Sequence, residues 1–149
     1  MKIDLTVAGY IFYENKVLLI QHKKSKLWLP VGGHISKNEI PDSAMIRKAI
    51  EEVGLEIKIL NMVGVSQKGN IVQQLAVPFY ANIHNVGNHN HYCLFYICES
   101  NSRKTILEEK EIMNSKWFSV EKLFERRIPI DVRSIGLLAF KKYGEIKIK

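Results

Sequence analysis

The chain has 149 residues, of which 46% are hydrophobic and 25% are charged, which is the composition of an ordinary globular domain. This length predicts a single domain over residues 1–149, and the composition argues against disorder of the whole chain. No apolar run approaches the roughly 18–20 residues that a membrane helix needs, and the first residues lack the pattern of an export signal. We therefore expect no membrane association.

The net charge of +7 favours polyanionic partners, either nucleic acid or a phosphate-rich small molecule. Nucleic-acid binding is the less favoured of the two, because no recognition motif accompanies the charge. Cys93 and Cys98 stand five residues apart, a spacing that on a strand points them to opposite faces and argues against a disulfide between them. Two buried thiols are typical of a reducing compartment, so we expect a cytoplasmic protein.

The residue pattern predicts strands along most of the chain. Stretches rich in β-branched and aromatic residues predict strands at residues 4–13, 16–23, 27–31, 55–66, 74–84, 91–98 and 112–118. Gly32 and Gly33 predict a loop. Two late helices are expected, one over residues 120–125 capped by Ser119 and one over residues 132–143 capped by Asp131.

The clearest helix covers residues 41–53, with Pro41 in its first turn and Gly54 as its stop. Its predicted apolar stripe consists of Met45, Ile46, Ala49, Ile50 and Val53. Its predicted charged face consists of Arg47, Lys48, Glu51 and Glu52. Strands with an inserted helix, followed by late helices, predict an α+β fold with a mixed sheet packed between helices.

The charged face of this helix has two physical interpretations. Arg47 with Glu51, and Lys48 with Glu52, are i,i+4 pairs of the kind found on solvated helix faces, worth a few tenths of a kcal/mol each. Carboxylates that converge near a glycine loop can also hold Mg²⁺, which prefers oxygen ligands. Such an ion neutralises phosphate oxygens and activates a water molecule. On these residues alone the solvated face is the commoner outcome.

The spacing of the segment from residue 33 to 55 resembles the Nudix box, the signature of MutT-like pyrophosphohydrolases. The matching positions are Gly33, Glu39, Arg47, Ala49, Glu51, Glu52, Gly54 and Leu55. The flanking segments KVLLIQHKKSKLWLPVGGHI and NSKWFSVEKLF are similar to the strands and helix around the box in that family. The resemblance covers nearly the whole chain and implies a Nudix-type α/β/α sandwich around a mixed β-sheet.

The resemblance also implies roles for individual residues. Glu51 and Glu52 match the paired metal ligands, and Gly32 matches the glycine whose carbonyl often joins them. Arg47 matches the arginine that orients these acids, and Glu39 matches the loop glutamate that supports the helix. Family members hydrolyse a nucleoside diphosphate linked to another group, use Mg²⁺ or Mn²⁺, and are often homodimers.

One box position departs from the family pattern. Lys48 stands where the family has the glutamate that follows the arginine, often a metal ligand and sometimes the base. Three functions stay open: a hydrolase with a reduced metal set, a weak or inactive Nudix domain that binds a nucleotide or a protein, and a basic nucleic-acid-binding module. For the hydrolase, the base would come from Glu108, Glu109 or Glu111, among which the sequence does not choose.

Residues outside the box are candidates for substrate binding. His34 follows the box glycine and is either a phosphate contact or a loop residue, and Lys23 lies in a basic loop that can meet phosphates. Tyr80 is a candidate to stack on a nucleobase. The three clustered histidines are His84, His89 and His91. Their spacing is not that of a zinc motif, which favours a substrate pocket or the surface for them.

Overall fold

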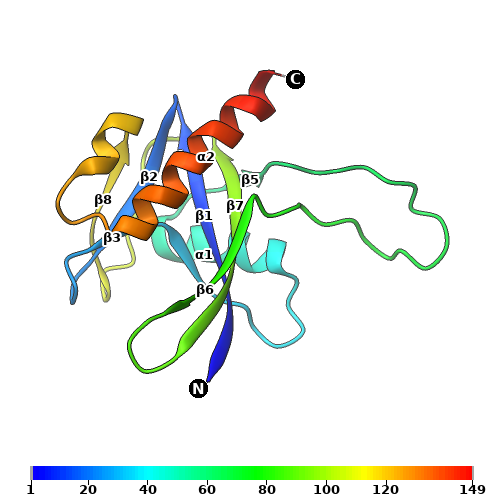
Figure 1. The fold of residues 1–149 in the computed structure, drawn as a ribbon, viewed down its shortest axis with the longest axis horizontal. Helices are drawn as coiled ribbons and strands as arrows, with labels where there is room; N and C mark the ends of the chain where they lie inside the picture. Colours follow the sequence, from blue (N-terminus) through cyan, green and yellow to red (C-terminus); the bar gives the residue numbers. More distant parts are fainter. Residues whose placement is uncertain (1, 149) are drawn as a thin grey trace.

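The computed structural model describes residues 2–148 and places strands and helices along this part of the chain (Figure 1). The strands are β1 (Ile3–Tyr13), β2 (Lys16–His22), β3 (Trp28–Leu29), β4 (Val31–His34), β5 (Ile57–Ile59), β6 (Tyr80–Asn85), β7 (Asn90–Ser100) and β8 (Ile112–Phe118). The helices are α1 (Pro41–Val53), the 3₁₀ helix η1 (Val120–Phe124) and α2 (Ile130–Ile148). Within these described residues, no helix is both long and apolar enough to cross a membrane.

The sheet is mixed and is built around β1. This strand pairs in parallel with β7, from Ile3 opposite Asn90 to Phe12 opposite Glu99. It pairs in the antiparallel sense with β2 and with β4. The remaining pairs, of β7 with β5 and β6 and of β2 with β3 and β8, are antiparallel. Strands from both halves of the chain therefore meet at β1.

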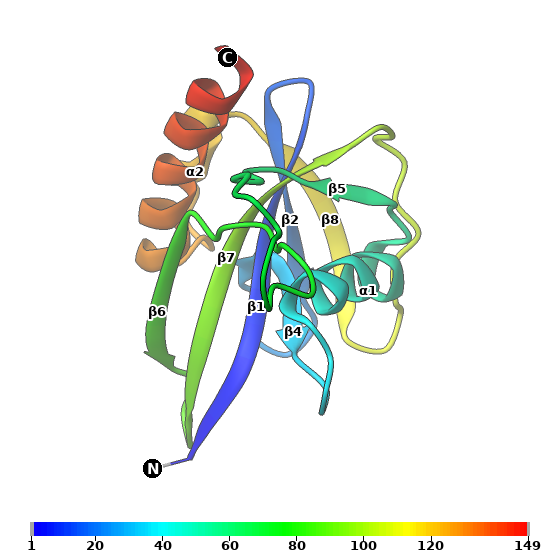
Figure 2. The same ribbon diagram turned by 90° about the vertical axis from the view of Figure 1, so that its right-hand side faces the viewer.

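Helices cover both faces of the sheet, with α2 on one side and α1 on the other (Figure 2). Alternation along the strands divides the core accordingly. On β1, Val7 and Ile11 pack with α1, whereas Tyr10 and Phe12 pack toward α2. The predicted sandwich around a mixed sheet is confirmed. The two cysteines are free and buried on opposite faces, as their spacing predicted.

Helix α1 has the predicted bounds. Pro41 begins it, and Gly54 ends it in a left-handed conformation with φ of 66°. The predicted apolar stripe is partly wrong, because Ile46 and Ile50 are 40% and 53% exposed. The buried residues are Ala44, Met45, Ala49 and Val53, so the face that meets the sheet is narrower and is rotated toward Ala44.

Other predicted bounds need correction. The strand expected at residues 55–66 is reduced to β5, and the one expected at 74–84 begins only at Tyr80. Between them lies a long irregular excursion that projects from the body of the protein (Figure 1). Gly32 and Gly33 belong to β4 rather than to a loop. Helix α2 begins before Asp131, which lies in its first turn and is not its cap.

Candidate active site

Arg47 is the centre of the box geometry. Its guanidinium donates to both carboxylate oxygens of Glu39, at 2.8 and 2.9 Å, and to Glu51 at 2.8 Å. It also donates to the backbone carbonyl of His34 at 3.0 Å. One planar side chain thus ties the loop, the helix and the end of β4 together, as bidentate arginine pairs do. These contacts lower the pKa of Glu39 to about 2, chiefly through the hydrogen bond from Arg47.

The two helix glutamates lie in different environments. Glu51 is exposed and held by Arg47, whose hydrogen bond is the main reason that its pKa lies below the ordinary value. Glu52 turns toward the sheet, where one carboxylate oxygen accepts a hydrogen bond from the Gly32 backbone N–H at 3.1 Å. Glu52 therefore packs against β4 and is not part of a fully solvated helix face, while its predicted role as a metal ligand stays a prediction.

Burial governs the charge of Glu52. Loss of solvent raises the pKa of its carboxyl to about 7, against the opposing effects of Lys48 and the Gly32 N–H. The charges of Glu111 and Glu51 raise it further. An ionised carboxylate in such a place needs a cation close by. A divalent ion at this point would supply one, and carboxylate oxygens are donors that Mg²⁺ accepts.

Lys48 occupies the place of the missing glutamate. Its ammonium lies 3.7 Å from Glu51, so the observed ion pair has i,i+3 spacing. Its side chain runs over Gly33, where an added Cβ would stand 2.4 Å from Lys48 Cε. The lysine charge is thus placed beside Glu51, where it would oppose the binding of a metal ion by these carboxylates.

Gly32 is required by the close approach of β4 to β1. An added Cβ would lie 2.2 Å from the backbone oxygen of Val7, a contact that no side chain can make. This approach brings the Gly32 N–H to Glu52. The glycine therefore fixes the distance between β4 and the carboxylate of the helix.

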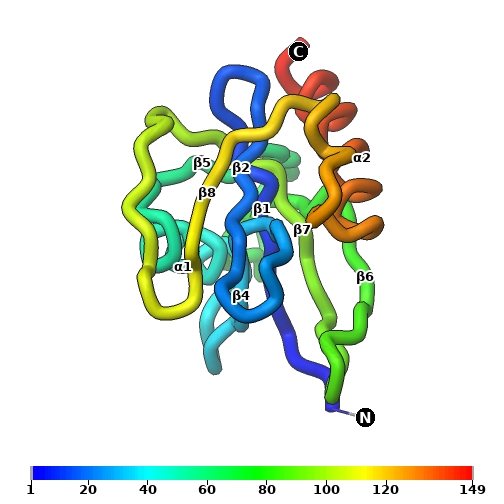
Figure 3. The backbone as a smooth tube through the Cα atoms, turned by 90° about the vertical axis from the view of Figure 1, so that its left-hand side faces the viewer, coloured from blue at the N-terminus to red at the C-terminus, as the bar shows by residue number. Residues whose placement is uncertain are grey.

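The segment from residue 101 to 111 runs beside α1 before it enters β8 (Figure 3). Backbone hydrogen bonds from Ile106 to Val53 and from Glu108 to Glu52 attach it to the end of the helix. The Glu108 carboxylate accepts from the backbone N–H groups of Lys110 and Glu111 and thus stabilises the turn. Of the three acids in this segment, Glu111 is the one whose charge acts on Glu52.

The predicted substrate residues lie in three places. His34 ends β4 and lies 3.1 Å from Asp4, so it is part of a side-chain cluster. The Lys23 ammonium donates to the Glu109 carbonyl and holds two loops together. Tyr80 begins β6 and packs against Phe95, on the sheet face that α2 covers. None of these contacts tests substrate binding, which stays a prediction for all three.

Sequence reasoning did not single out Asp4. This residue lies near the start of the chain, and β-strand register brings it to His34, His89 and His91. No local pattern around Asp4 signals such a cluster, because its partners are 30 or more residues away.

The structure combines a mixed sheet between two helices with a pair of glutamates on the helix that follows β4, the strand that contains Gly32 and Gly33. These features define the class of proteins that carry a Nudix box. A model of the NUDIX domain family matches residues 2–138. This chain belongs to the Nudix family. Members of this family hydrolyse nucleoside diphosphate derivatives and generally use divalent metal ions. Among curated proteins, no sequence matches this chain.

Solved structures give the same result. A Nudix-family hydrolase from Clostridium perfringens is 32% identical, with a TM-score of 0.86 over 96% of this chain and 99% of that one. An ADP-ribose pyrophosphatase from Streptococcus suis is 18% identical, with a TM-score of 0.62 over 94% and 91%. The NUDIX domain of Shewanella oneidensis NrtR, solved with ADP ribose, is 17% identical, with a TM-score of 0.69 over 96% and 90%. The last two share the fold with this chain.

Proposed function

We propose that this chain is a working pyrophosphohydrolase that cleaves a phosphoanhydride bond in a nucleoside diphosphate linked to another group. The observation that carries this proposal is the box geometry, in which Arg47 holds Glu39 and Glu51 while the half-buried Glu52 accepts a hydrogen bond from Gly32. The substrates named for the Streptococcus suis and Shewanella oneidensis structures make ADP-ribose the first compound to test.

A single Mg²⁺ or Mn²⁺ ion fits the donors better than several. Glu51, Glu52 and the Gly32 carbonyl supply oxygen donors, and Lys48 adds a positive charge where the family has another carboxylate. When bound, the ion would neutralise phosphate oxygens and lower the pKa of a bound water. Arg47 keeps the carboxylates in place, since it bonds to Glu51 and to the carbonyl of β4.

Glu111 is our candidate for the general base. Its charge acts on Glu52, whereas the Glu108 carboxylate is bound within its own turn. In this scheme Glu111 accepts a proton from water, the oxygen of that water bonds to phosphorus, and the bridging P–O bond breaks with its electrons on the leaving phosphate. Glu111→Gln should then lower kcat by roughly 10²–10⁴-fold, and Glu109→Gln should leave it unchanged.

The second candidate is a Nudix domain that binds a nucleotide without turnover, and the position of Lys48 favours it. The lysine ammonium near Glu51 already neutralises part of the carboxylate charge. In that case the chain binds ADP-ribose but does not cleave it, and Lys48→Glu creates turnover.

The test is a hydrolysis assay against ADP-ribose, nucleoside triphosphates, dinucleoside polyphosphates and capped RNA, with Mg²⁺ and with Mn²⁺. Wild-type turnover on one of them supports the hydrolase and names its substrate. Binding without turnover, combined with activity of Lys48→Glu, supports the second candidate. A reducing compartment agrees with the two free cysteines. Cytoplasmic location and the homodimer stay predictions.

A further inference from the structure

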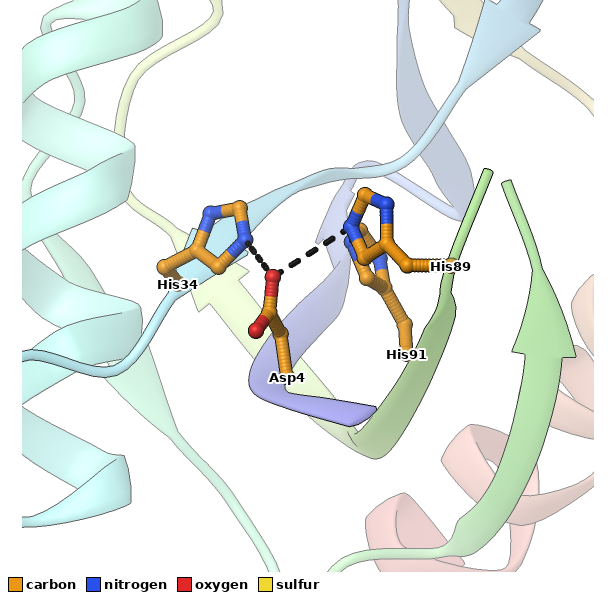
Figure 4. Close-up of side chains that lie close together, drawn as sticks. All are labelled: Asp4, His34, His89 and His91. Carbon is orange, nitrogen blue, oxygen red and sulfur yellow. Dashed lines mark hydrogen bonds and ion pairs between the residues drawn. The ribbon is translucent and has the colours of Figure 1, made fainter. Parts of the chain in front are cut away.

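Four side chains converge at the N-terminal end of β1, on the sheet face opposite α1. Asp4 stands opposite His91 across the parallel pair of β1 and β7, and His34 enters from β4 opposite Thr6. His89 comes from the turn that precedes β7. Figure 4 shows the three imidazole rings gathered around the Asp4 carboxylate. We call these four residues, Asp4, His34, His89 and His91, the histidine cluster.

Three of the distances within the histidine cluster are close to those between the ligands of one metal ion. Asp4 Oδ2 lies 3.1 Å from His34 Nε2 and 3.3 Å from His89 Nε2. The Nε2 atoms of His89 and His91 are 3.2 Å apart, and all four donor atoms lie within 4.8 Å of one another. Tetrahedral Zn²⁺ with nitrogen and oxygen ligands at 2.0–2.2 Å separates its ligand atoms by roughly 3.3–3.6 Å. The observed separations leave room for one such ion.

Neighbouring groups prepare the rings to act as ligands. His89 Nδ1 lies 2.7 Å from Asn88 Oδ1, and donation of its proton there leaves the lone pair of Nε2 directed at the cluster. His91 lies at the centre of the group, half-buried, with its ring in edge contact with the rings of His34, His84 and His89. His84 packs beside His91 but bonds to Asn82, so it is outside the ligand set.

We propose that Asp4, His34, His89 and His91 form a structural site for a Zn²⁺-type transition-metal ion, separate from the carboxylate site of the box. Nitrogen donors suit Zn²⁺, whereas the all-oxygen box suits Mg²⁺. The two sites lie on opposite sides of β4, since the His34 carbonyl bonds to Arg47 while its ring faces Asp4. The ion joins β1, β4 and the turn before β7, which are far apart in the sequence. This proposal stands independently of the proposed function.

The experiment titrates Zn²⁺ into tag-free protein that has been treated with a chelator, in excess Mg²⁺ so that the box carboxylates are already occupied. Calorimetry gives affinity and stoichiometry, and Co²⁺ in place of Zn²⁺ gives the strong visible absorption of tetrahedral coordination. The variants are His34→Asn, His91→Asn and Asp4→Asn. His22→Gln is the control, because this histidine lies on β2 outside the cluster.

We expect one ion per chain in the wild type and in His22→Gln. In each cluster variant we expect the affinity for Zn²⁺ to be at least about 10- to 100-fold weaker, since a change to a residue that merely orients a metal ligand already costs that much. Zn²⁺ should also raise the Tm of the wild type but not of His34→Asn; because the His34 side chain is 61% exposed, we expect this variant to fold. The proposal fails if Zn²⁺ does not bind in excess Mg²⁺, if Co²⁺ shows only weak octahedral absorption, or if His22→Gln weakens binding as much as His34→Asn does.

Discussion

Replacement of Gly32 by alanine tests the close approach that positions the candidate site. An added Cβ would lie 2.2 Å from the Val7 backbone oxygen and 2.9 Å from Ala8 Cα, and neither atom can move unless β1 moves with it. Overpacking of an interior costs about 1–3 kcal/mol, and a contact with backbone belongs at the upper end of that range. For a chain of this size we expect Tm to fall by roughly 4–12 °C.

Gly33→Ala is the matched control, because the atoms that its Cβ would meet are movable. They are Cε and Nζ of Lys48, the far end of a flexible side chain. We expect this variant to change the free energy of unfolding by less than about 0.5 kcal/mol, as most surface changes do. Urea unfolding of both variants beside the wild type measures the difference. Equal losses, or a larger loss for Gly33→Ala, would refute the argument from distance.

Three further predictions use single groups. Arg47 lowers the folded-state pKa of Glu39 to about 2 from an ordinary 4.5. The ionised Glu39 carboxylate therefore makes its full contribution to stability above pH 4.5, and this contribution disappears as pH falls toward 2. Urea unfolding of Glu39→Gln should therefore show a loss at pH 7 that shrinks by pH 3, and a loss that is equal at both pH values contradicts this. Burial raises the pKa of the Cys93 thiol to about 11, so both cysteines should react with a disulfide reagent at pH 8 only after unfolding, and prompt reaction of the native chain argues against it. Tyr143→Phe removes a 2.5 Å hydrogen bond to the Glu99 carboxylate and should lower the free energy of unfolding by about 1.5–3 kcal/mol; no change in the urea midpoint would show that water replaces this bond.

The sequence predicted best the elements that short-range signals define. Pro41 and Gly54 mark the two ends of α1, and both signals act within a turn of the residues that they affect. The strand at Ile112–Phe118 was also predicted with its observed bounds. The Nudix-type fold followed from the spacing of the box.

The irregular excursion after β5 was not predictable from composition. Val63, Val65 and Val72 are strand-forming residues, yet they are exposed and form no ladder. Strand formation requires a partner, and of the two predicted strands only Ile57–Ile59 and the part from Tyr80 onward pair with β7. Propensity alone therefore overestimates the length of both flanking strands.

In the candidate site, too, the sequence predicted the short-range contacts and missed those that depend on how distant strands pack. The contacts of Arg47 with Glu51 follow from helical spacing, and the resemblance to the box supplied Glu39. The burial of Glu52 depends on where β4 passes, which no local pattern gives. The histidine cluster depends on the register between β1 and β7, where a shift of one residue would turn Asp4 to the other face.

The central claim is that the box of this chain catalyses hydrolysis although Lys48 replaces one of its acids. The most direct test measures initial rates of Mg²⁺-dependent cleavage of the best substrate in the panel. It compares the wild type with Glu52→Gln and with Glu56→Gln, a control at an exposed glutamate just beyond α1. The account predicts turnover in the wild type, a loss of at least about 100-fold in Glu52→Gln, and an unchanged rate in Glu56→Gln. Wild-type turnover that survives in Glu52→Gln, or no turnover on any substrate of the panel, would contradict it.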